Sequence, residues 1–200
     1  MARPISPLLS REKIARAAIE LIDAGEELRI QPLAKKLGVS LSSLYHHVEG
    51  REGIIHAMRE VLSSEYAFSP PTHGPWQDVL REGVHSLWCL YSDHPRVMIH
   101  LLGVTIHEPD TLRLYEALVE GLRQAGLPDE ELLTTLEVLD AFAFGVALDA
   151  LSPMNIFAPE LSDSPLTDLV RIHPTGRERN QRLYDQGLEI ILAGIESLVR

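Results

Sequence analysis

Residues 29–55 contain a group of polar side chains whose spacing suits contact with DNA. Four of them fall on the outward face of a short helical pattern: Ser42, Ser43, Tyr45 and His46. Hydroxyl and imidazole groups donate hydrogen bonds to phosphate oxygens and also bond to base edges in the grooves of a duplex. The chemistry that these side chains offer is therefore recognition of nucleic acid.

Two short helices on either side of a tight turn must hold these groups in place. The first helix has three apolar residues close together, Leu33, Ala34 and Leu37. Gly38 falls where a left-handed residue ends that helix, and Ser40 is a favourable N-cap for the next one. The second helix is expected to have an inner face formed by Leu41, Leu44 and Val48. This arrangement predicts a helix-turn-helix whose second helix enters the major groove.

The stretch LAKKLGVSLSSLYHHVEGREGII resembles the DNA-binding end of the TetR family of bacterial transcriptional repressors. The resemblance extends to the Leu44-Tyr45 pair and to the turn into the next helix. It implies a repressor with a helix-turn-helix domain and a helical domain that binds a small molecule and dimerises. A plain helical hairpin is the alternative, but such a hairpin does not need Gly38, Ser40 and Tyr45 at these spacings.

The resemblance assigns DNA contacts to eight residues of this chain: Gln31, Leu41, Ser42, Ser43, Tyr45, His46, His47 and Arg51. Tyr45 and His47 are expected to donate to phosphate oxygens, and Arg51 adds a positive charge. Gln31 suits a bidentate pair with adenine, and Leu41 suits contact with a thymine methyl group. His46 and His47 are adjacent, so on a helix they diverge by about 100° and do not form a metal pair.

The chain is acidic, with a net charge of −11, but its charge is distributed unevenly. Residues 1–51 hold eight Lys and Arg against six Asp and Glu, whereas the other 149 residues have a net charge of −13. Positive charge is thus concentrated around the helix-turn-helix. The single cysteine, Cys89, cannot form an internal disulfide, which suits a reducing cytosol. Neither a signal peptide nor a long apolar run is visible, so the sequence predicts a soluble cytoplasmic protein.

Helical periodicity recurs along the rest of the chain, without strand alternation or internal repeats. Ser10 and Gly25 bound a first helix that should pack behind the helix-turn-helix. Further helices are predicted at 51–68, 76–91, 95–102, 109–124, 129–151 and 180–199, with a loop over 152–176 that contains one short helix near 164–172. The prediction is an all-α protein of nine or ten helices. It comprises a DNA-binding domain at 1–50 and an effector-binding and dimerisation domain at 51–200.

Two of these helices are more apolar than a single core-facing stripe requires. The terminal helix carries Ile190, Ile191, Leu192 and Ile195, and the 129–151 helix carries Phe142, Phe144, Val146 and Leu148. Glycines that would let packed helices approach closely lie at Gly145, Gly187 and Gly194. Burial against both the core and a partner explains this composition, with a wholly buried core helix as the alternative. Members of the TetR family dimerise through their last two long helices, so the resemblance implies a homodimer.

The resemblance also implies a pocket for a small effector in the second half of the chain. Its candidate residues are Trp88, Met98, His100, Leu101, Phe142 and Asp149. Alignment with the tetracycline-binding branch places His100 at that branch's metal-ligating histidine and Asp149 at its pocket glutamate. Other polar tetracycline contacts fall on Ala67, Gly83 and Gly121, which cannot make the same hydrogen bonds. We therefore expect a mostly apolar effector other than tetracycline, although each candidate alone also fits ordinary core.

Two other classes of function stay open at this point. A helical hydrolase is disfavoured because the sequence contains no G-x-S-x-G, H-E-x-x-H or C-x-x-C motif and no phosphate-binding glycine loop. The chain is therefore not expected to be an enzyme. A DNA-binding module without an effector would use its apolar body only as core. The expected partners are operator DNA, a second copy of the chain and a small effector, with no cofactor, no protein-bound metal and no membrane.

Overall fold

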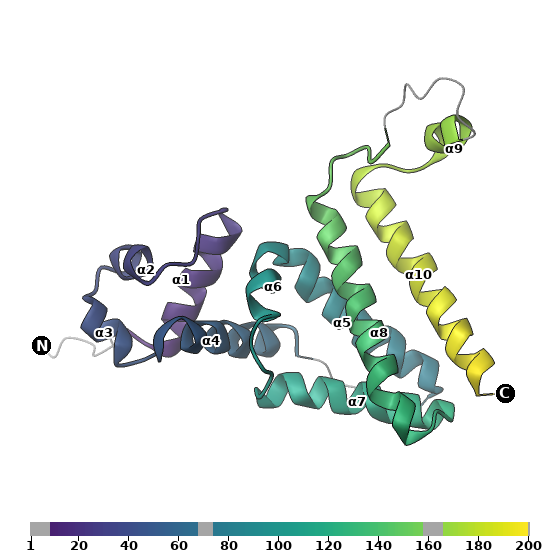
Figure 1. Ribbon diagram of the computed structural model, residues 1–200, viewed down its shortest axis with the longest axis horizontal. Coiled ribbons are helices and arrows are strands. Elements are labelled where there is room, and N and C mark those ends of the chain that lie inside the picture. The colour runs from purple at the N-terminus through teal and green to yellow at the C-terminus, as the bar shows by residue number, and fades with distance from the viewer. Residues whose placement is uncertain (1–8, 68–73, 158–165, 200) are drawn as a thin grey trace, which may run out of the picture. The chain divides into compact units, whose positions relative to one another are not determined.

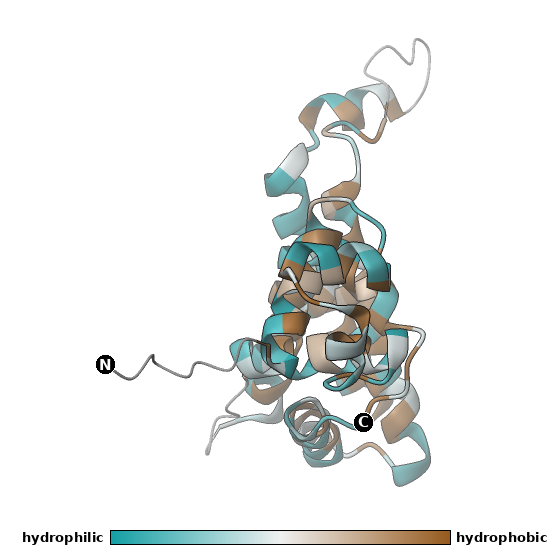
Figure 2. Ribbon diagram, turned by 90° about the vertical axis from the view of Figure 1, so that its left-hand side faces the viewer, coloured by the Kyte–Doolittle hydropathy of each residue, from teal (hydrophilic) through white to brown (hydrophobic). Residues whose placement is uncertain are grey.

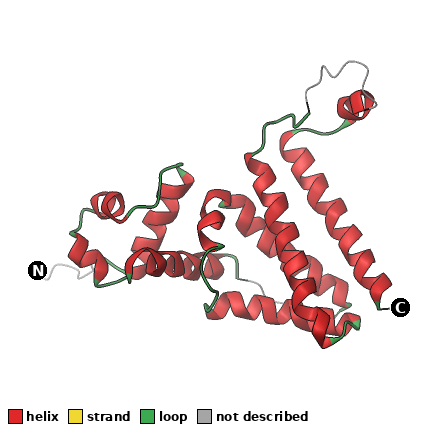
Figure 3. Cartoon of the chain, in the orientation of Figure 1, coloured by secondary structure: helices red, strands yellow, loops and turns green. Residues whose placement is uncertain are grey.

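The computed structural model describes residues 9–67, 74–157 and 166–199, and in these ranges the chain is all-α without strands (Figures 1 and 3). The helices are α1 (Arg11–Asp23), α2 (Ile30–Leu37), α3 (Leu41–Tyr45), α4 (Gly50–Glu65), α5 (Trp76–Asp93), α6 (Pro95–Leu101), α7 (Pro109–Ala125), α8 (Asp129–Leu148), α9 (Leu166–Ile172) and α10 (Gly176–Leu198). A short 3-10 helix, η1 (Asp149–Leu151), follows α8. The predicted fold class is confirmed, and the number of α-helices among the described residues is ten.

The chain forms two compact units, of which the first comprises residues 1–67 and 96–113. Its helix-turn-helix has the predicted caps. Gly38 ends α2 with φ +66°, and the Ser40 hydroxyl accepts a hydrogen bond from the Ser43 backbone N–H at 3.1 Å. The Ser10 hydroxyl caps α1 in the same way through Lys13. Helices α1 and α3 begin at these positions because a side-chain oxygen accepts a hydrogen bond from a helical N–H that would otherwise have no partner.

The inner face predicted for the second helix needs a correction. Leu44 and Val48 are buried, but Leu41 is 40% exposed. Helix α3 spans only Leu41–Tyr45, so Val48 reaches the core from the turn that follows the helix. Because Leu41 is the first helical residue, its side chain lies beside the turn, outside the packed face.

The core of the first unit lies mainly between α1 and α4. The largest fully buried side chains here are Ile14, Ile22, Leu33, Leu44, Ile54, Ile55, Met58 and Leu62. Helix α4 begins at Gly50 and ends at Glu65, so the predicted 51–68 was about right at its start but extended too far, since residues 66 and 67 are not helical. Residue 68 itself lies outside the described ranges.

The second unit comprises residues 68–95 and 114–200 and includes α5, most of α7, and α8, η1, α9 and α10. Its core contains Leu80, Leu87, Leu118, Leu122 and Leu139. The predicted 129–151 helix is α8 followed by η1, and the terminal helix begins at Gly176, four residues before the predicted Asn180. The helices carry hydrophobic and hydrophilic residues side by side (Figure 2), as helices with one buried face do.

Helices α8 and α10 run antiparallel and side by side (Figure 1). The Asn180 amide near the start of α10 donates to the carbonyl of Val146 near the end of α8 at 2.7 Å. A Cβ at Gly187 would lie 2.4 Å from the Phe142 ring, so this glycine permits close packing inside the protomer. By contrast, a Cβ at Gly145 or Gly194 would meet nothing within 4 Å. These two glycines therefore lie where the chain itself packs nothing against α8 and α10.

The two compact units reflect packing and do not test the predicted functional division at residue 50. In packing terms α4 belongs with the helix-turn-helix, since it shares a core with α1. A division into a DNA-binding domain at 1–50 and an effector-binding domain at 51–200 therefore stays a prediction. None of the described helices is long and apolar enough to cross a membrane.

Candidate DNA-binding surface and effector site

Seven of the eight candidate DNA contacts are exposed on the first unit: Gln31, Leu41, Ser42, Tyr45, His46, His47 and Arg51. Ser43, the eighth, is half-buried, and its hydroxyl lies 3.0 Å from the Ser40 hydroxyl. The cap of α3 therefore already engages Ser43. Leu44 is fully buried, whereas the next residue, Tyr45, is 52% exposed. The sequence predicted this division between an inner and an outer face. The roles of these residues toward DNA remain predictions.

Much of the positive charge near the helix-turn-helix is paired within the unit. Arg11 binds Glu60 at 2.9 Å, Arg16 binds Glu12 and Glu65, and Lys36 lies 3.2 Å from Glu20. These pairs are exposed, so each stabilises the fold by at most about 1 kcal/mol and is weakened by salt. Phosphate contact would compete with them for the same cations.

Arg51 and His100, which were predicted to contact DNA and the effector respectively, contact each other. The Arg51 Nη2 lies 2.9 Å from Nδ1 of His100, a candidate effector contact from α6. Burial and the adjacent guanidinium lower the pKa of His100, so the ring is neutral at pH 7. Because a guanidinium can only donate, Nδ1 of the neutral His100 ring accepts this hydrogen bond and the ring proton lies on Nε2. The candidate phosphate contact and the candidate effector contact are thus hydrogen-bonded to each other.

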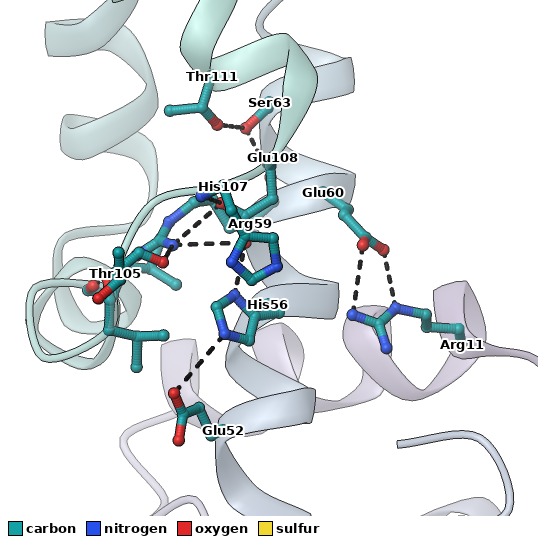
Figure 4. Close-up of polar contacts among 12 residues, drawn as sticks. Arg11, Glu52, His56, Arg59, Glu60, Ser63, Thr105, His107, Glu108 and Thr111 are labelled. Carbon is teal, nitrogen blue, oxygen red and sulfur yellow. Dashed lines mark hydrogen bonds and ion pairs between the residues drawn. The ribbon is translucent and has the colours of Figure 1, made fainter. Parts of the chain in front are cut away.

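A buried ion pair fixes α4 to the segment before α7 (Figure 4). Arg59 on α4 donates to Glu108 Oε2 at 3.1 Å, and both side chains are almost completely buried. The same guanidinium donates to three backbone carbonyls, those of Leu101, Val104 and Thr105, at 2.7 to 3.0 Å. The pKa of Glu108 is lowered: burial acts to raise it, but hydrogen bonds from His56 and Arg59 outweigh that effect.

The six candidate effector residues divide between the two units. Met98, His100 and Leu101 belong to the first unit, and Trp88, Phe142 and Asp149 to the second. Met98 and Leu101 are buried in their own unit. The assignment of all six to one effector site therefore stays a prediction.

Trp88 and Phe142 meet through a third aromatic residue. The buried Tyr184 ring stacks on Trp88 with a centroid distance of 4.2 Å and lies 6.0 Å from Phe142. A cavity of about 490 Å³ borders this cluster and is lined by Trp88, Ser92 and Asp149 among others. Within the described structure the Trp88 Nε1–H and the Ser92 hydroxyl are buried without a hydrogen-bond partner. Unpaired groups of this kind beside a cavity suit a ligand that offers one acceptor and one donor.

Asp149 is less available for a ligand than the sequence suggested. Its carboxylate accepts hydrogen bonds from Arg179 Nη2 at 3.0 and 2.9 Å, from Arg179 Nε at 3.3 Å and from the Asn180 amide at 3.2 Å. A second cavity, of about 640 Å³, touches the same ion pair and has an apolar rim that includes Ile156, Leu169, Ile172, Leu183 and Ile190. Asp149 therefore lies between two cavities and is held in place by Arg179.

A second carboxylate, Asp140, has hydroxyl partners and is half-buried in the second unit. It accepts hydrogen bonds from the hydroxyl groups of Tyr91 at 2.6 Å and Tyr115 at 3.2 Å. Burial raises the pKa of Asp140 although both hydrogen bonds act to lower it. The folded protein thus binds this proton more tightly than the unfolded chain does. Stability from this group must increase as pH falls through the folded-state pKa.

Asp140→Asn should remove that pH dependence while leaving an oxygen that both tyrosines can donate to. The native protein should lose stability as the pH rises from 4 to 8, whereas the variant should not. The free energy of unfolding of the variant minus that of the native protein is therefore expected to increase over this range. Urea titrations at several pH values measure this difference. A difference that is constant, or that changes in the opposite direction, would contradict the assignment.

Arg59, Glu108, Asp140 and Arg179 were not among the residues predicted from the sequence to matter. No local pattern distinguishes them, because each buried pair joins residues at least 25 positions apart. The only usable signal was the presence of charged residues at core-facing positions. Arg59, for example, lies one residue after the fully buried Met58 on α4.

Comparison with known proteins supports the same family that the helix-turn-helix sequence resembles. A model of the tetracyclin repressor-like C-terminal domain matches residues 69–199, more than half of the chain. The tetracycline repressor protein class D of Escherichia coli is 27% identical over 203 residues, covering 96% of this chain and 88% of that protein.

Solved structures show the same fold at lower identity. Apo ActR from Streptomyces coelicolor matches with a TM-score of 0.80 and 24% identity, over 98% of this chain and 97% of that one. ActR has also been solved in complex with actinorhodin. BioQ with its natural double-stranded DNA operator matches with a TM-score of 0.70 and 16% identity, over 94% and 98% of the two chains. With the matched family model, these findings establish that the chain belongs to the TetR family of transcriptional regulators, which are not enzymes.

Proposed function

We propose that the protein is a homodimeric repressor that binds palindromic operator DNA and is released by a small, mostly apolar effector. The observation that carries the DNA-binding part is the capped helix-turn-helix, in which Leu44 is buried while Tyr45, His46 and His47 are exposed. In a symmetric dimer the two recognition helices must lie about 34–36 Å apart to enter successive major grooves. Since its partner is DNA, we infer that the protein acts in the cytoplasm.

Replacing Tyr45 by Ala should weaken operator binding at least about tenfold, because a hydrogen bond to a charged phosphate is lost in each protomer. The loss should be similar for all DNA sequences. Gln31→Ala should instead reduce the preference for the operator over variant sites, by about 1–3 kcal/mol at the base that Gln31 reads. Fluorescence anisotropy at fixed salt measures both quantities.

Arg123→Ala is the matched control for these DNA-binding variants. It removes an exposed positive charge from the second unit, where Arg123 pairs with Glu120 and Asp129. Operator affinity should not change in this control. If Tyr45→Ala and Gln31→Ala also leave affinity and site preference unchanged, the proposed reading surface is wrong.

The proposed effector is not tetracycline, and the packing of two glycines supports this. A Cβ at Gly83 would lie 2.6 Å from Leu118, and one at Gly121 would lie 3.2 Å from Leu80 and Val79. Helices α5 and α7 are therefore too close at these positions for a polar side chain that could bind the ligand. The cavity beside Trp88 and Ser92 supports a ligand with a large apolar surface and one or two polar groups.

His100 is the proposed link between effector and DNA. An effector that bonds to His100 would compete with Arg51, which lies in the first turn of α4 next to the recognition segment. A ligand releases DNA only if it binds the released conformation better than the DNA-bound one. A hundredfold difference, about 2.7 kcal/mol, is enough for a useful switch.

A thermal-shift screen of apolar metabolites and drugs tests this proposal. Trp88→Phe should reduce the largest shift, as expected for a ligand in the cavity beside Trp88 and Ser92, and His100→Ala tests separately whether the effector acts through Arg51. Trp88→Phe keeps an aromatic ring but removes the unpaired Nε1–H. A dominant shift with tetracycline and magnesium would refute the choice of effector. If no compound shifts the melting temperature or releases DNA, the alternative of a DNA-binding regulator without an effector replaces it.

A further inference from the structure

Three side chains that commonly bind metal ions meet in the first unit. His56 comes from α4, and His107 and Glu108 come from the segment that leads into α7 (Figure 4). One potential ligand atom of each residue lies within 4.8 Å of those of the other two. Two imidazole nitrogens and one carboxylate oxygen form a ligand set that zinc takes in open sites.

The orientation of His56 is already suited to a metal ligand. Its Nδ1 lies 2.7 Å from Glu108 Oε1, and its ring centroid is 4.0 Å from that of His107. Its other nitrogen, Nε2, faces a second carboxylate, Glu52, at 3.8 Å. Metal-binding histidines usually donate their other N–H to such a group, which fixes the tautomer and the ring orientation. Glu52 lies one helical turn before His56 and is exposed, so it can move into hydrogen-bonding distance.

Glu108 is held in place through both oxygens, with the shorter bonds from Arg59 and the backbone on Oε2 and with His56 on Oε1. Its Oε2 accepts hydrogen bonds from Arg59 Nη1 and from the backbone N–H of His107, both at 3.1 Å. The carboxylate is almost completely buried and cannot rotate freely. Its Oε1 therefore stays directed at His56.

The Arg59 guanidinium is the main charge that opposes a cation at this position. Its Nη2 donates to the carbonyls of Leu101 and Val104 at 2.7 and 2.8 Å, and its Nη1 donates to that of Thr105 at 3.0 Å. These carbonyl dipoles stabilise the positive charge of the guanidinium, whose Nη1 lies 3.4 Å from Oε1 as well as 3.1 Å from Oε2. Glu108 and Glu52 together offset that charge and part of the charge of a divalent ion.

We propose that His56 Nδ1, a ring nitrogen of His107 and Glu108 Oε1 bind one divalent transition-metal ion of the zinc type. Water completes the four-coordinate shell, and Glu52 holds Nε2 of His56. Zinc–nitrogen bonds of about 2.0–2.1 Å require only that the exposed His107 ring move inward and that the His56–Glu108 pair open slightly. The ion would join α4 to the segment before α7 at a place where the sequence contains no ligand-spacing motif.

Zinc binding by the untagged, chelator-treated full-length protein tests the proposal. A competition titration with a chromogenic chelator should give one equivalent of bound zinc per chain, and Co²⁺ should give the visible absorption bands of a four-coordinate site. His107→Ala should lower zinc affinity at least about a hundredfold and abolish the Co²⁺ bands. Glu52→Ala should lower zinc affinity by about 10–100-fold, as loss of an outer carboxylate does.

Two variants control for zinc held elsewhere. His173→Ala removes an exposed histidine of the second unit, and Cys89→Ser removes the thiol that lies 3.6 Å from His85 Nδ1. Neither should change the stoichiometry or the Co²⁺ spectrum. His107→Ala leaves the Arg59–Glu108 pair intact, and circular dichroism without metal checks that it folds. Absence of zinc binding at micromolar concentration, or zinc binding that survives His107→Ala or disappears in Cys89→Ser, overturns the proposal.

Discussion

Arg59→Met is expected to destabilise the first unit by about 3–5 kcal/mol, because it leaves the Glu108 carboxylate buried without its main charged partner. Three carbonyls also lose their donor. A loss of this size is a large fraction of the stability of a typical domain, which is about 5–15 kcal/mol. Urea denaturation followed by circular dichroism, in buffer with a chelator, measures it as a lower midpoint.

The neighbouring exposed ion pair is the matched control. Glu60 follows Arg59 directly on α4 and binds Arg11 from α1 at 2.9 Å (Figure 4), with both side chains partly in solvent. Arg11→Met should therefore cost no more than about 1 kcal/mol. The double variant Arg59→Met with Glu108→Leu should recover part of the loss, since it removes both charges together. Equal effects of Arg59→Met and Arg11→Met would show that burial of the pair does not govern stability here.

Local signals in the sequence predicted the helix-turn-helix well. Gly38 can adopt a positive φ at low cost, and Ser40 supplies its own hydrogen bond to a helix N–H. Both effects act over a few residues, so they do not depend on the rest of the fold. The predicted positions of helix ends that lack such a signal were less accurate. The start of α10 at Gly176 is an example, because the N-cap residue Thr175 makes no side-chain hydrogen bond.

Long-range contacts explain what the sequence could not predict. No local pattern in the sequence marks His107, and its place beside His56 depends on how α4 packs against the segment before α7. The sequence also could not show which residues of the apolar terminal helix face the core, and burial of its other side against a partner stays a prediction. Leu192 and Ile195 are buried within the protomer, whereas Ile190 is 64% exposed. Periodicity shows that a helix has more apolar residues than one buried face needs. It does not show which side of the helix packs against the core.

The open face of α8 and α10 supports the proposed homodimer. It exposes large apolar side chains at Leu133, Val138, Leu183, Ile190 and Leu198. Because Gly187 packs on Phe142 and Asn180 on Val146, Val138 and Ile190 lie at similar heights along the antiparallel pair. Gly145 and Gly194 lie on the same two helices with open space above them, so a partner helix can approach closely.

Val138→Asp should convert the dimer to folded monomers. Val138 is 50% exposed in the protomer, so the variant should fold, but an aspartate buried at the interface has no partner. An unpaired buried charge costs about 3–5 kcal/mol, and a two-fold symmetric interface contains it twice. We therefore expect the dissociation constant to rise by at least about 10⁴-fold. Light scattering should report a mass near 22.3 kDa instead of twice that value.

Ile190→Asp on α10 should give the same result, and Ile99→Asp on α6 should stay dimeric although Ile99 is 55% exposed. Ile195→Asp is unsuitable for this test because Ile195 is 3% exposed and belongs to the protomer core. Operator affinity should fall together with dimerisation, since one protomer reaches only one half-site. A native protein that sediments as a folded monomer, or a Val138→Asp variant that stays dimeric, would contradict this interface. Loss of dimerisation with unchanged operator affinity would show instead that one protomer is sufficient for binding.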